Sequence, residues 1–356
     1  MPVTATAAVV VAAALDALVA EPPARIHPVA LLGRVVTRVE RQSDGWTAYG
    51  RVSPRTVGIL AALCIPLGFA AAAAGLVWIG AAATDAPWVA TLLAAGALFS
   101  TTSLRLLLDS ARTVIDESDA DLDAARGDLP ALAGRDPDSL DAGHVRSAAV
   151  ESLAENLADG LVAPLFAFAL AAAAASANGP IATTEAAGAL APTTASGAVD
   201  TLVPTAPAGA TDTLPLVAGA GAAAWVKAVN TLDSMVGYRS VPIGWAPARL
   251  DDLVMWLPAR LTALLLAVVA GAPTLPFDAQ IRTLARQPSS PNSGWPMATM
   301  AALLPARLRK PGAYELDPAR SGSATLPDVA SATRAVRITR GAGTLAFALA
   351  GVIAWY

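Results

Sequence analysis

The residues best suited to chemistry in this chain form three polar clusters, each beside a long apolar run. In the first cluster, Glu151, Glu155 and Asp159 recur every four residues, and this spacing places them along one face of a helix. Like charges at this spacing repel by a few tenths of a kcal/mol per pair, so the cluster does not serve stability. It suits a divalent cation or an ammonium group; a solvated helix start is the alternative interpretation.

The second and third clusters add cations and amides. Asn230 and Asp233 lie one helical turn apart, three residues after Lys227. Oxygen ligands at this spacing suit Mg²⁺, which takes one or two carboxylates plus substrate phosphates; a polar helix end is the alternative. The third cluster runs from Arg249 to Asp252 and continues to Arg260. Because apolar segments flank Arg260, it needs a carboxylate or phosphate partner, unless it extends to the membrane surface.

Composition defines the class of protein that carries these clusters. Of the 356 residues, 55% are hydrophobic and 15% are charged, against about 25% charged in an ordinary soluble domain. A net charge of −4 argues against a nucleic-acid partner and, with the apolar composition, against disorder. A single cysteine, Cys64, and two histidines exclude an internal disulfide and a histidine-rich zinc centre. The remaining class is a polytopic membrane protein.

Apolar runs predict how the chain crosses a bilayer. A crossing helix needs about 20 mostly apolar residues, so we expect an all-α integral membrane bundle with about five to seven transmembrane or re-entrant helices in one domain, 1–356. The candidate segments are 3–20, 56–84, 86–104, 160–184, 214–229, 253–272 and 341–356. Only Asp85 separates the second segment from the third, which predicts a helical hairpin.

The basic residues predict orientation, because cytoplasmic loops carry an excess of Lys and Arg. All 24 lie within four segments: 25–55, 105–146, 227–260 and 282–340. We therefore expect cytoplasmic polar segments at about 21–55, 105–150, 230–252 and 278–340, and a site facing the cytoplasm of the cell membrane. Residues 177–213 lack basic residues and are rich in Ala, Thr, Gly and Pro, which predicts a flexible external loop. For the basic segment 282–340 to lie on the cytoplasmic side, either 253–272 is re-entrant or a further crossing lies near 294–305.

Taken together, these strings resemble the CobD/CbiB family of cobalamin biosynthesis. In chain order, the matching strings are HPV with a following Gly-Arg (27–34), GRD (134–136), ESLAENLADGLVAPLF (151–166), AVNTLDSMVGYR (228–239), ARLDDLVMWLPARLTALL (248–265) and SPNSGWPMA (290–298). Two departures stand out: Glu21 replaces the aspartate of a family Gly-Asp-Pro string, and Pro137 replaces a threonine.

The resemblance implies a membrane ligase similar to adenosylcobinamide-phosphate synthase. Such an enzyme uses ATP to join a propionate carboxyl of adenosylcobyric acid to aminopropanol or its phosphate, which gives adenosylcobinamide or its phosphate. ATP and Mg²⁺ are implied as co-substrate and activator, and the corrinoid is a substrate, not a cofactor. The implied partners are these small molecules and the lipid bilayer, with other cobalamin-pathway enzymes as candidates. The chain has no Walker A string to mark a nucleotide site.

The resemblance and the polar clusters together suggest individual roles. The residues expected to act in catalysis, as metal ligands or as acceptors of the proton from the attacking ammonium, are Glu151, Glu155, Asp159, Asp251, Asp252 and, as a proton shuttle, His27. Those expected to bind substrate are Lys227, Arg249, Arg260, Asn156, Asn230, Asn292, Ser293, Trp295 and Asp136. Those expected to hold Mg²⁺ are Asp233, Glu155 and Asp159.

Two other functions compete with a ligase. A transporter for a small anionic substrate pairs its charges across mid-membrane helices, whereas the charges here collect at the expected cytoplasmic ends. A Mg²⁺-dependent membrane prenyltransferase would account for Asn230, Asp233 and the Asp251-Asp252 pair. It would not account for the acidic helix at 151–159 or the loop at 290–297.

Overall fold

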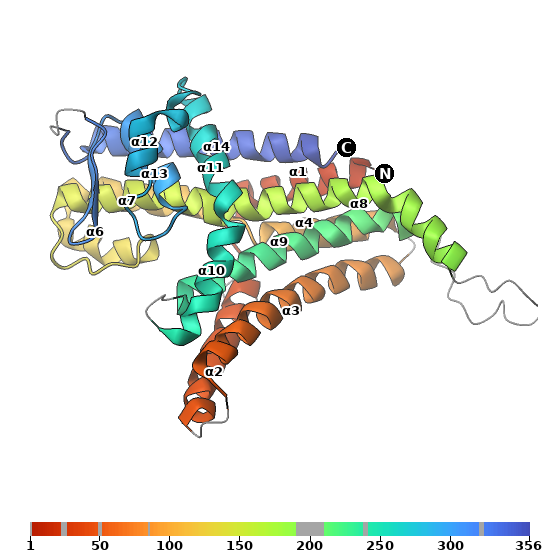
Figure 1. Cartoon of the computed structure of the whole chain (residues 1–356). Coiled ribbons are helices and arrows are strands. Elements are labelled where there is room, and N and C mark those ends of the chain that lie inside the picture. The colour runs from red at the N-terminus through yellow and green to blue at the C-terminus, as the bar shows by residue number, and fades with distance from the viewer. Residues whose placement is uncertain are drawn as a thin grey trace, which may run out of the picture.

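The chain is described by a computed structural model built almost entirely from helices, which covers residues 2–22, 27–48, 52–84, 86–189, 210–237, 241–319 and 324–356 (Figure 1). The α-helices are α1 (Pro2–Val19), α2 (Pro28–Ala48), α3 (Pro54–Ala82), α4 (Pro87–Phe99), α5 (Leu104–Ala120), α6 (Leu122–Asp128), α7 (Ala142–Leu157), α8 (Ala163–Ala189), α9 (Ala210–Val236), α10 (Trp245–Val254), α11 (Trp256–Val269), α12 (Ala279–Leu284), α13 (Gly294–Leu303) and α14 (Val329–Ile353). Three short 3-10 segments are η1 (Leu129–Ala131), η3 (Pro242–Gly244) and η4 (Leu275–Phe277), and η2 (Ala158–Val162) is a π-helix. Strands β1 (Leu308–Lys310) and β2 (Tyr314–Leu316) form one antiparallel hairpin.

Several of these helices can cross a membrane. In the described part of the chain, four stretches are long and apolar enough: Pro54–Ala82, Trp88–Ala120, Ala142–Asn178 and Val329–Ile353. The α10–α11 pair, bent by 46° at its junction, makes a fifth when it is counted as one span. These findings confirm the all-helical membrane bundle. A bent pair of this kind is either one broken span or the re-entrant segment expected as one alternative for 253–272. α13, with 10 residues, is only about 15 Å long and does not supply the other alternative, a further crossing near 294–305.

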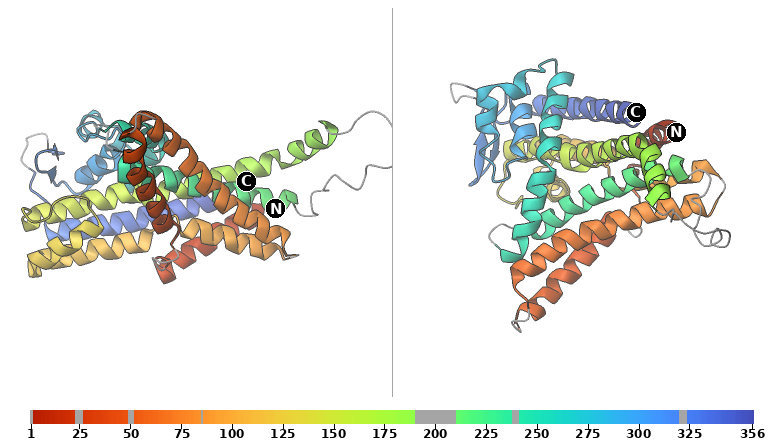
Figure 2. Two further views of the ribbon diagram at one scale, coloured as in Figure 1. Left: turned by 90° about the horizontal axis from the view of Figure 1, so that it is seen from below. Right: turned by 45° about the vertical axis from the view of Figure 1, so that its right-hand side comes forward.

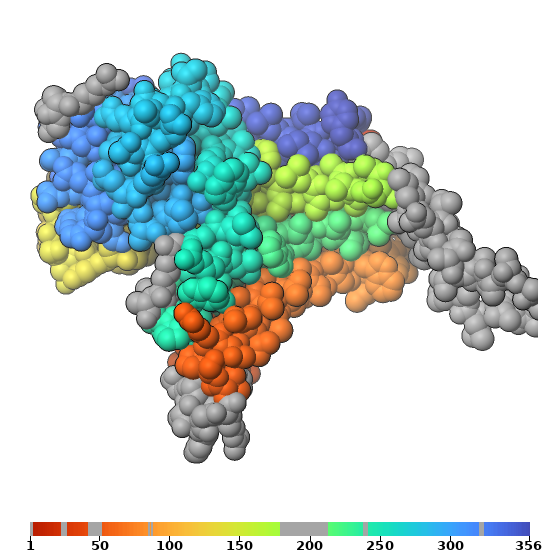
Figure 3. Space-filling view, in the orientation of Figure 1, coloured from red at the N-terminus to blue at the C-terminus, as the bar shows by residue number. Residues whose placement is uncertain are grey.

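The long helices give the molecule two ends of different character. α7, η2 and α8 continue as one long helix, α14 runs beside it, and α9 packs against both α8 and α3 (Figure 1). The shorter elements α6, α12 and α13 gather around α7 at one end, while both termini lie at the other (Figure 1). Figure 2 shows the same separation from two further directions. In the space-filling view the C-terminal segments and the region of α7 form one continuous block at the first end (Figure 3).

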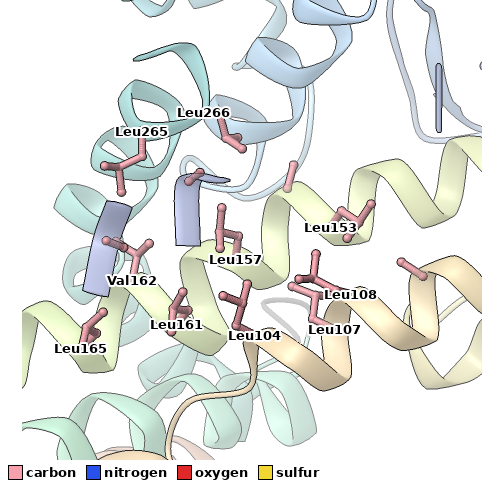
Figure 4. Close-up of a cluster of buried hydrophobic side chains, with 14 of the residues drawn as sticks. Leu104, Leu107, Leu108, Leu153, Leu157, Leu161, Val162, Leu165, Leu265 and Leu266 are labelled. Atoms are coloured by element: carbon pink, nitrogen blue, oxygen red, sulfur yellow. The ribbon is translucent and has the colours of Figure 1, made fainter. Parts of the chain in front are cut away.

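An aliphatic core joins this block to the rest of the bundle. Its side chains come from α5, α7, η2, α8 and α11 (Figure 4). The labelled members are Leu104, Leu107, Leu108, Leu153, Leu157, Leu161, Val162, Leu165, Leu265 and Leu266. Elsewhere small residues let the helices approach closely: a Cβ placed on Gly219 would lie 2.9 Å from the ring of Phe168, so α9 rests directly on α8.

A reciprocal pair of side chains fixes the end of α1 beside the start of α5. The buried carboxylate of Asp16 accepts hydrogen bonds from the backbone N–H groups of Leu104 (2.9 Å) and Arg105 (3.1 Å). In return the guanidinium of Arg105 donates to the carbonyls of Ala17 (2.7 Å) and Leu18 (3.0 Å). Helix ends leave such backbone groups unsatisfied. Each helix therefore completes the other, and Asp16 has a structural use inside an apolar helix.

Some boundaries differ from those expected. The expected external loop, 177–213, is shorter, because α8 continues to Ala189 and α9 begins at Ala210. The remainder of that loop lies outside the described residues. The expected last span, 341–356, is only the second half of α14, which begins at Val329 where Asp328 caps it through the backbone N–H of Ser331. The predicted hairpin of apolar helices is confirmed, because α3 and α4 pack together.

Candidate functional site

The site lies where several helices are interrupted at one level of the bundle. α4 and α5 are separated by Ser100–Ser103, α7 passes into the π-turn η2, and α10 breaks from α11 at Met255. Two of these breaks touch, because the backbone N–H of Ser103 donates to the carbonyl of Gly160 (2.9 Å). π-turns are frequent at functional sites, and membrane proteins build binding sites where helices are discontinuous. Polar side chains gather at this level.

An acidic cluster with one amide forms the centre of the site. The side-chain amide of Asn230 on α9 donates to the carboxylate of Asp159 in η2 (3.1 Å). Asn230 also faces Asp251 on α10, which lies within electrostatic range of Asp159 and Asp233. Lys227, one turn before Asn230, is within range of Asp159. Residues from three motifs that are separate in the sequence therefore lie close together here.

The donor chemistry of this cluster fits Mg²⁺. Asp159, Asp233 and Asp251 offer carboxylate oxygens, and the buried Oδ1 of Asp251 has no hydrogen-bond partner in the described part of the chain. Across those same residues no three His, Cys, Asp or Glu side chains come close enough to hold a metal by themselves. Mg²⁺ needs only one or two carboxylates when water and substrate phosphates supply the rest. Mg²⁺ bound here would therefore need water or a phosphate group for its remaining ligands.

Glu151 has a different environment from Glu155 and Asp159. Its carboxylate, 1% exposed, accepts hydrogen bonds from Ser147 (2.8 Å) and Tyr314 and pairs with Arg135 (2.8 Å). These bonds satisfy the Glu151 carboxylate without any ligand. They also hold β2 and the loop that contains Arg135 against α7. Glu155 instead lies within electrostatic range of Asp159 and Lys310. Of the three acids on this helix, the structure brings Asp159 to the cluster and Glu155 near it.

Tyr314 and Arg135, the partners of Glu151, lie outside the membrane spans, and the charge of Glu151 shifts the pKa of both. Burial and the Glu151 charge raise the pKa of the Tyr314 hydroxyl, so Tyr314 remains a hydrogen-bond donor. Burial lowers the pKa of Arg135, but the charge of Glu151 more than offsets this and the net shift is upward. The guanidinium of Arg135 therefore stays charged beside Glu151. The backbone N–H of Arg309 also donates to Ser147 (2.8 Å), which adds β1 to the same network.

Arg260 lies between two aromatic rings on the far side of the α10–α11 break. Its guanidinium carbon is 4.5 Å from the centre of the Trp256 ring and 4.8 Å from that of Trp295. It donates to the side-chain oxygen of Asn292 (2.9 Å), whose amide donates to the carbonyl of Asp252 (2.8 Å). The 290–297 loop is thus tied to α10 and α11. Among the described residues, Arg260 thus pairs with an amide, the carbonyl of Trp256 (2.6 Å) and two aromatic rings, and not with a carboxylate.

A cavity of about 390 Å³, with several polar residues in its lining, extends to Lys227 beside the acidic cluster. It lies between the end of α1, the start of α2, the α4–α5 break and α9. His27 lines it, with Nε2 3.8 Å from the carboxylate of Glu21 and Nδ1 accepting the backbone N–H of Val29 (3.1 Å). Burial and the charge of Lys227 lower the pKa of His27, against an opposing effect of Glu21. Lys227 lines the same cavity and connects it with Asp159.

The remaining predicted residues lie around this centre or apart from it. Asn156 donates to the carbonyl of Leu132 (3.3 Å) and so holds the η1 loop. Ser293 is half-buried at the start of α13, where its backbone N–H contacts Ser290 Oγ (3.4 Å). Arg249 is exposed on α10. Asp136 is also exposed and closes a local turn by accepting the N–H of Asp138 (3.1 Å), so neither residue joins the acidic cluster.

Sequence reasoning did not single out two features of the site. Ser100 to Ser103 is a run of four hydroxyl residues at the end of an apolar helix. This break in the apolar sequence could have identified it. Arg135 and Tyr314 were also missed, although Arg135 lies inside the GRD string and neighbours Asp136. Their partner, Glu151, is distant in sequence, so spacing gives no indication of the pairing.

Comparison with known proteins extends over nearly the whole chain. A family model described as "CobD/Cbib protein" matches residues 9–339. A cobalamin biosynthesis protein CobD of Mycobacterium tuberculosis is 35% identical over 97% of this chain and 96% of its own length. Proteins of the same description from Rhodobacter capsulatus (33%, covering 88% and 85%) and, as a probable CobD, Methanothrix thermoacetophila (31%, covering 86% and 84%) are also similar. No solved structure matches the chain.

Proposed function

Because the chain belongs to the CobD/CbiB family and so has a role in cobalamin biosynthesis, we propose that it is an ATP-dependent ligase that forms the amide bond of adenosylcobinamide or its phosphate. Its substrates are adenosylcobyric acid and aminopropanol or aminopropanol phosphate. The observation that carries the proposal is the convergence of Asp159, Asn230 and Asp251 beside Lys227 at the helix breaks. Such a set combines carboxylates that can accept a proton with a cation that can offset phosphate charge, and ATP-dependent amide formation needs both.

The proposed reaction has two steps. A propionate oxygen of the corrinoid attacks the γ-phosphorus of ATP, the bond to the β-phosphate oxygen breaks, and an acyl phosphate and ADP form. The amine nitrogen then attacks the acyl carbon, and inorganic phosphate leaves with the C–O bonding electrons. The ammonium form of the amine cannot attack, so one proton must pass to a base before the C–N bond forms.

The residues of the cluster fit these needs. Asp159 and Asp251 are the carboxylates nearest Asn230, and either can accept the ammonium proton. Lys227 offers positive charge where phosphate charge develops. Mg²⁺, held by one or two of Asp159, Asp233 and Asp251, would supply further charge stabilisation to phosphoryl transfer. Asn230 orients Asp159 through their hydrogen bond.

The surroundings of the cluster also suit a large, partly polar substrate from the cytosol. Trp256 is 55% exposed beside Arg260, which gives a corrin ring an aromatic surface and a cation at the same place. The polar end of the bundle carries many of the basic residues, among them Arg105, Arg112 and Arg135. By the positive-inside rule this end faces the cytoplasm of the cell membrane.

Complementation tests this function. A strain blocked between cobyric acid and cobinamide should make cobinamide again when it carries the wild-type chain. The Asp251→Asn variant should fail at an equal level of membrane protein. Asp116→Asn, at an exposed position on α5, is the matched control and should complement. Complementation by Asp251→Asn, or vesicle uptake of a corrinoid without amide formation, would contradict the proposal.

A further inference from the structure

The outer side of the α10–α11 pair carries an apolar stripe. Leu257, Leu261, Leu264 and Val268 recur at intervals of three and four residues along α11, which places them on one side of the helix. Leu257 and Val268 are 57% and 45% exposed, the two leucines between them are half-buried, and Leu253 at the end of α10 is 74% exposed. These five residues form the apolar stripe. An exposed apolar surface of this kind marks a place where lipid or protein binds.

The opposite side of the pair is fixed to the bundle. Leu265 and Leu266 of α11 pack into the same cluster as Leu157 and Val162 (Figure 4). Asp251 on α10 is buried and takes part in the acidic cluster. Because one side of the pair is held by these contacts, the direction in which the apolar stripe faces is set by the fold.

The chain enters and leaves this pair at the same end of the bundle. α9 runs away from the end that holds both termini and leads into α10, and α13, which follows α11, packs against α7 at the polar end (Figure 1). α10 and α11 also run across the direction of α8 and α14, not along it (Figure 1 and the right-hand view of Figure 2). A helix that crossed a membrane beside α8 and α14 would run with them and would end at the other side.

The level of α11 lies near one edge of the apolar layer. Val162, in the cluster that α11 joins, is followed by an apolar helical segment to Asn178 that is about 24 Å long. α14 gives a similar result, because a Cβ placed on Gly341 would lie 2.6 Å from Val269, and Ile353 lies about 18 Å further along the helix. The hydrocarbon core of a bilayer is about 30 Å thick, so most of it lies on the side of the termini.

Aromatic and basic side chains accompany the stripe. The guanidinium carbon of Arg55, in the first turn of α3, lies 5.5 Å from the centre of the Trp245 ring at the start of α10. Trp245 is 40% exposed, and Arg249, one turn further along α10, is exposed as well. Tryptophan is enriched where a membrane meets water, and arginine can reach lipid phosphates from there. These three side chains fit a layer of phosphate headgroups.

We propose that α10 and α11 lie in the plane of the cytoplasmic membrane surface, with the apolar stripe among lipid chains and the neighbouring tryptophan and arginines among phosphate headgroups. The occupant is the lipid leaflet, because the stripe continues the apolar outer surface of α3, against which α10 packs and on which Leu60 and Leu63 are also exposed. The placement does not depend on the ligase function. It puts Asp251 at the boundary between membrane and cytosol, where polar substrates can reach it without entering the bilayer.

Depth measurements on spin-labelled protein in lipid vesicles test this placement. With Cys64 replaced by alanine, a nitroxide is attached at Leu257→Cys, Leu264→Cys or Val268→Cys in turn. Each label should collide more with oxygen, which dissolves in lipid, than with a water-soluble nickel chelate. All three should lie at a similar depth, about 5–10 Å below the headgroup boundary. A crossing helix would instead separate the first position from the last by about 17 Å in depth.

Two control positions calibrate the measurement. Leu170→Cys, at an exposed position on α8 about 12 Å beyond Val162, should lie deeper in the lipid than the three labels of the stripe. Asp116→Cys, at an exposed position on α5, should collide mainly with the nickel chelate.

Three results would overturn the proposal. A depth difference of about 17 Å along the stripe would show that α11 crosses the membrane. Collision mainly with nickel would place the stripe in the cytosol, and labels that neither reagent reaches, with dipolar broadening between copies, would show that a second copy of the chain covers it. Footprinting of unlabelled wild type in the same vesicles with a lipid-soluble carbene reagent does not depend on the variants folding. It should modify residues 253–268, and a lack of modification there would also overturn the proposal.

Discussion

The Glu151→Gln variant should be less stable than wild type, but the rate of the reaction per folded molecule should change little. The carboxylate accepts hydrogen bonds from Ser147, Arg135 and Tyr314, and it is almost fully buried. Glutamine has one acceptor oxygen and presents an NH₂ group to donors at the other position. Arg135, whose side chain is 11% exposed, then loses its only ion-pair partner among the described residues.

The expected cost follows from that unpaired charge. Removing one partner of a buried ion pair costs about 3–5 kcal/mol, because the other charge stays buried. Thermal unfolding of the detergent-solubilised variant should therefore begin well below that of wild type. The double variant Arg135→Met/Glu151→Gln should lose less than the sum of the two single variants, because the second change removes the group that the first leaves unpaired.

Two measurements decide between this account and a catalytic role. Unfolding temperature reports the structural loss, and kcat per folded molecule, measured below that temperature, reports the chemistry. We expect a lower unfolding temperature with kcat within a few-fold of wild type. An unchanged unfolding temperature together with a kcat reduced by orders of magnitude would contradict the structural role and show that Glu151 takes part in the reaction.

Four further predictions concern other parts of the site. Glu155→Gln should leave the unfolding temperature unchanged or slightly higher, since it relieves like-charge repulsion with Asp159, but amide formation should fall by orders of magnitude, because Glu155 is expected to act beside Asp159 as a base or Mg²⁺ ligand; a near-wild-type rate would exclude Glu155 from the reaction and leave Asp159 and Asp251 as its carboxylates. Arg260→Lys keeps the charge but loses the planar group between two aromatic rings and the bond to Asn292, so the KM for the corrinoid should rise about tenfold, and an unchanged KM would contradict this. Asp16→Asn should cost about 1–3 kcal/mol of stability, measured by thermal unfolding, because two backbone N–H groups at the start of α5 lose a charged acceptor; no change would show that water replaces it. Burial holds the pKa of His27 below its ordinary value of about 6.5, so protonation opposes folding, and wild type should lose stability relative to His27→Gln as the pH falls from 7 to 5; a constant difference would contradict this.

Apolar run length was sufficient to predict the class of fold. The charge-free segments at 56–84 and 86–104 became the neighbouring helices α3 and α4, and the apolar start of the chain became α1. The same reasoning did not show where helices are interrupted. Ser100–Ser103 and the π-turn at Ala158–Val162 owe their conformations to contacts across the bundle, such as the bond from Ser103 to Gly160.

The proximity of polar side chains could be predicted only where a motif had no structural use. Asp159, Asn230 and Asp251 were chosen because their apolar context does not need them, and they do converge. Glu151 was chosen on the same ground, but Arg135 and Tyr314 supply a reason that lies 16 and 163 residues away in the sequence. A periodic pattern indicates which residues share one face of a helix. It does not indicate which distant side chain packs against that face.

The stoichiometry of the reaction shows whether the protein couples ATP hydrolysis to amide formation. Purified protein in lipid vesicles would be given adenosylcobyric acid, aminopropanol phosphate, Mg²⁺ and ATP, with Asp251→Asn as the inactive comparison. We expect one ADP and one inorganic phosphate for each adenosylcobinamide phosphate formed, and none of the three with Asp251→Asn. Amide formation without ATP consumption, or equal turnover by Asp251→Asn, would contradict this expectation.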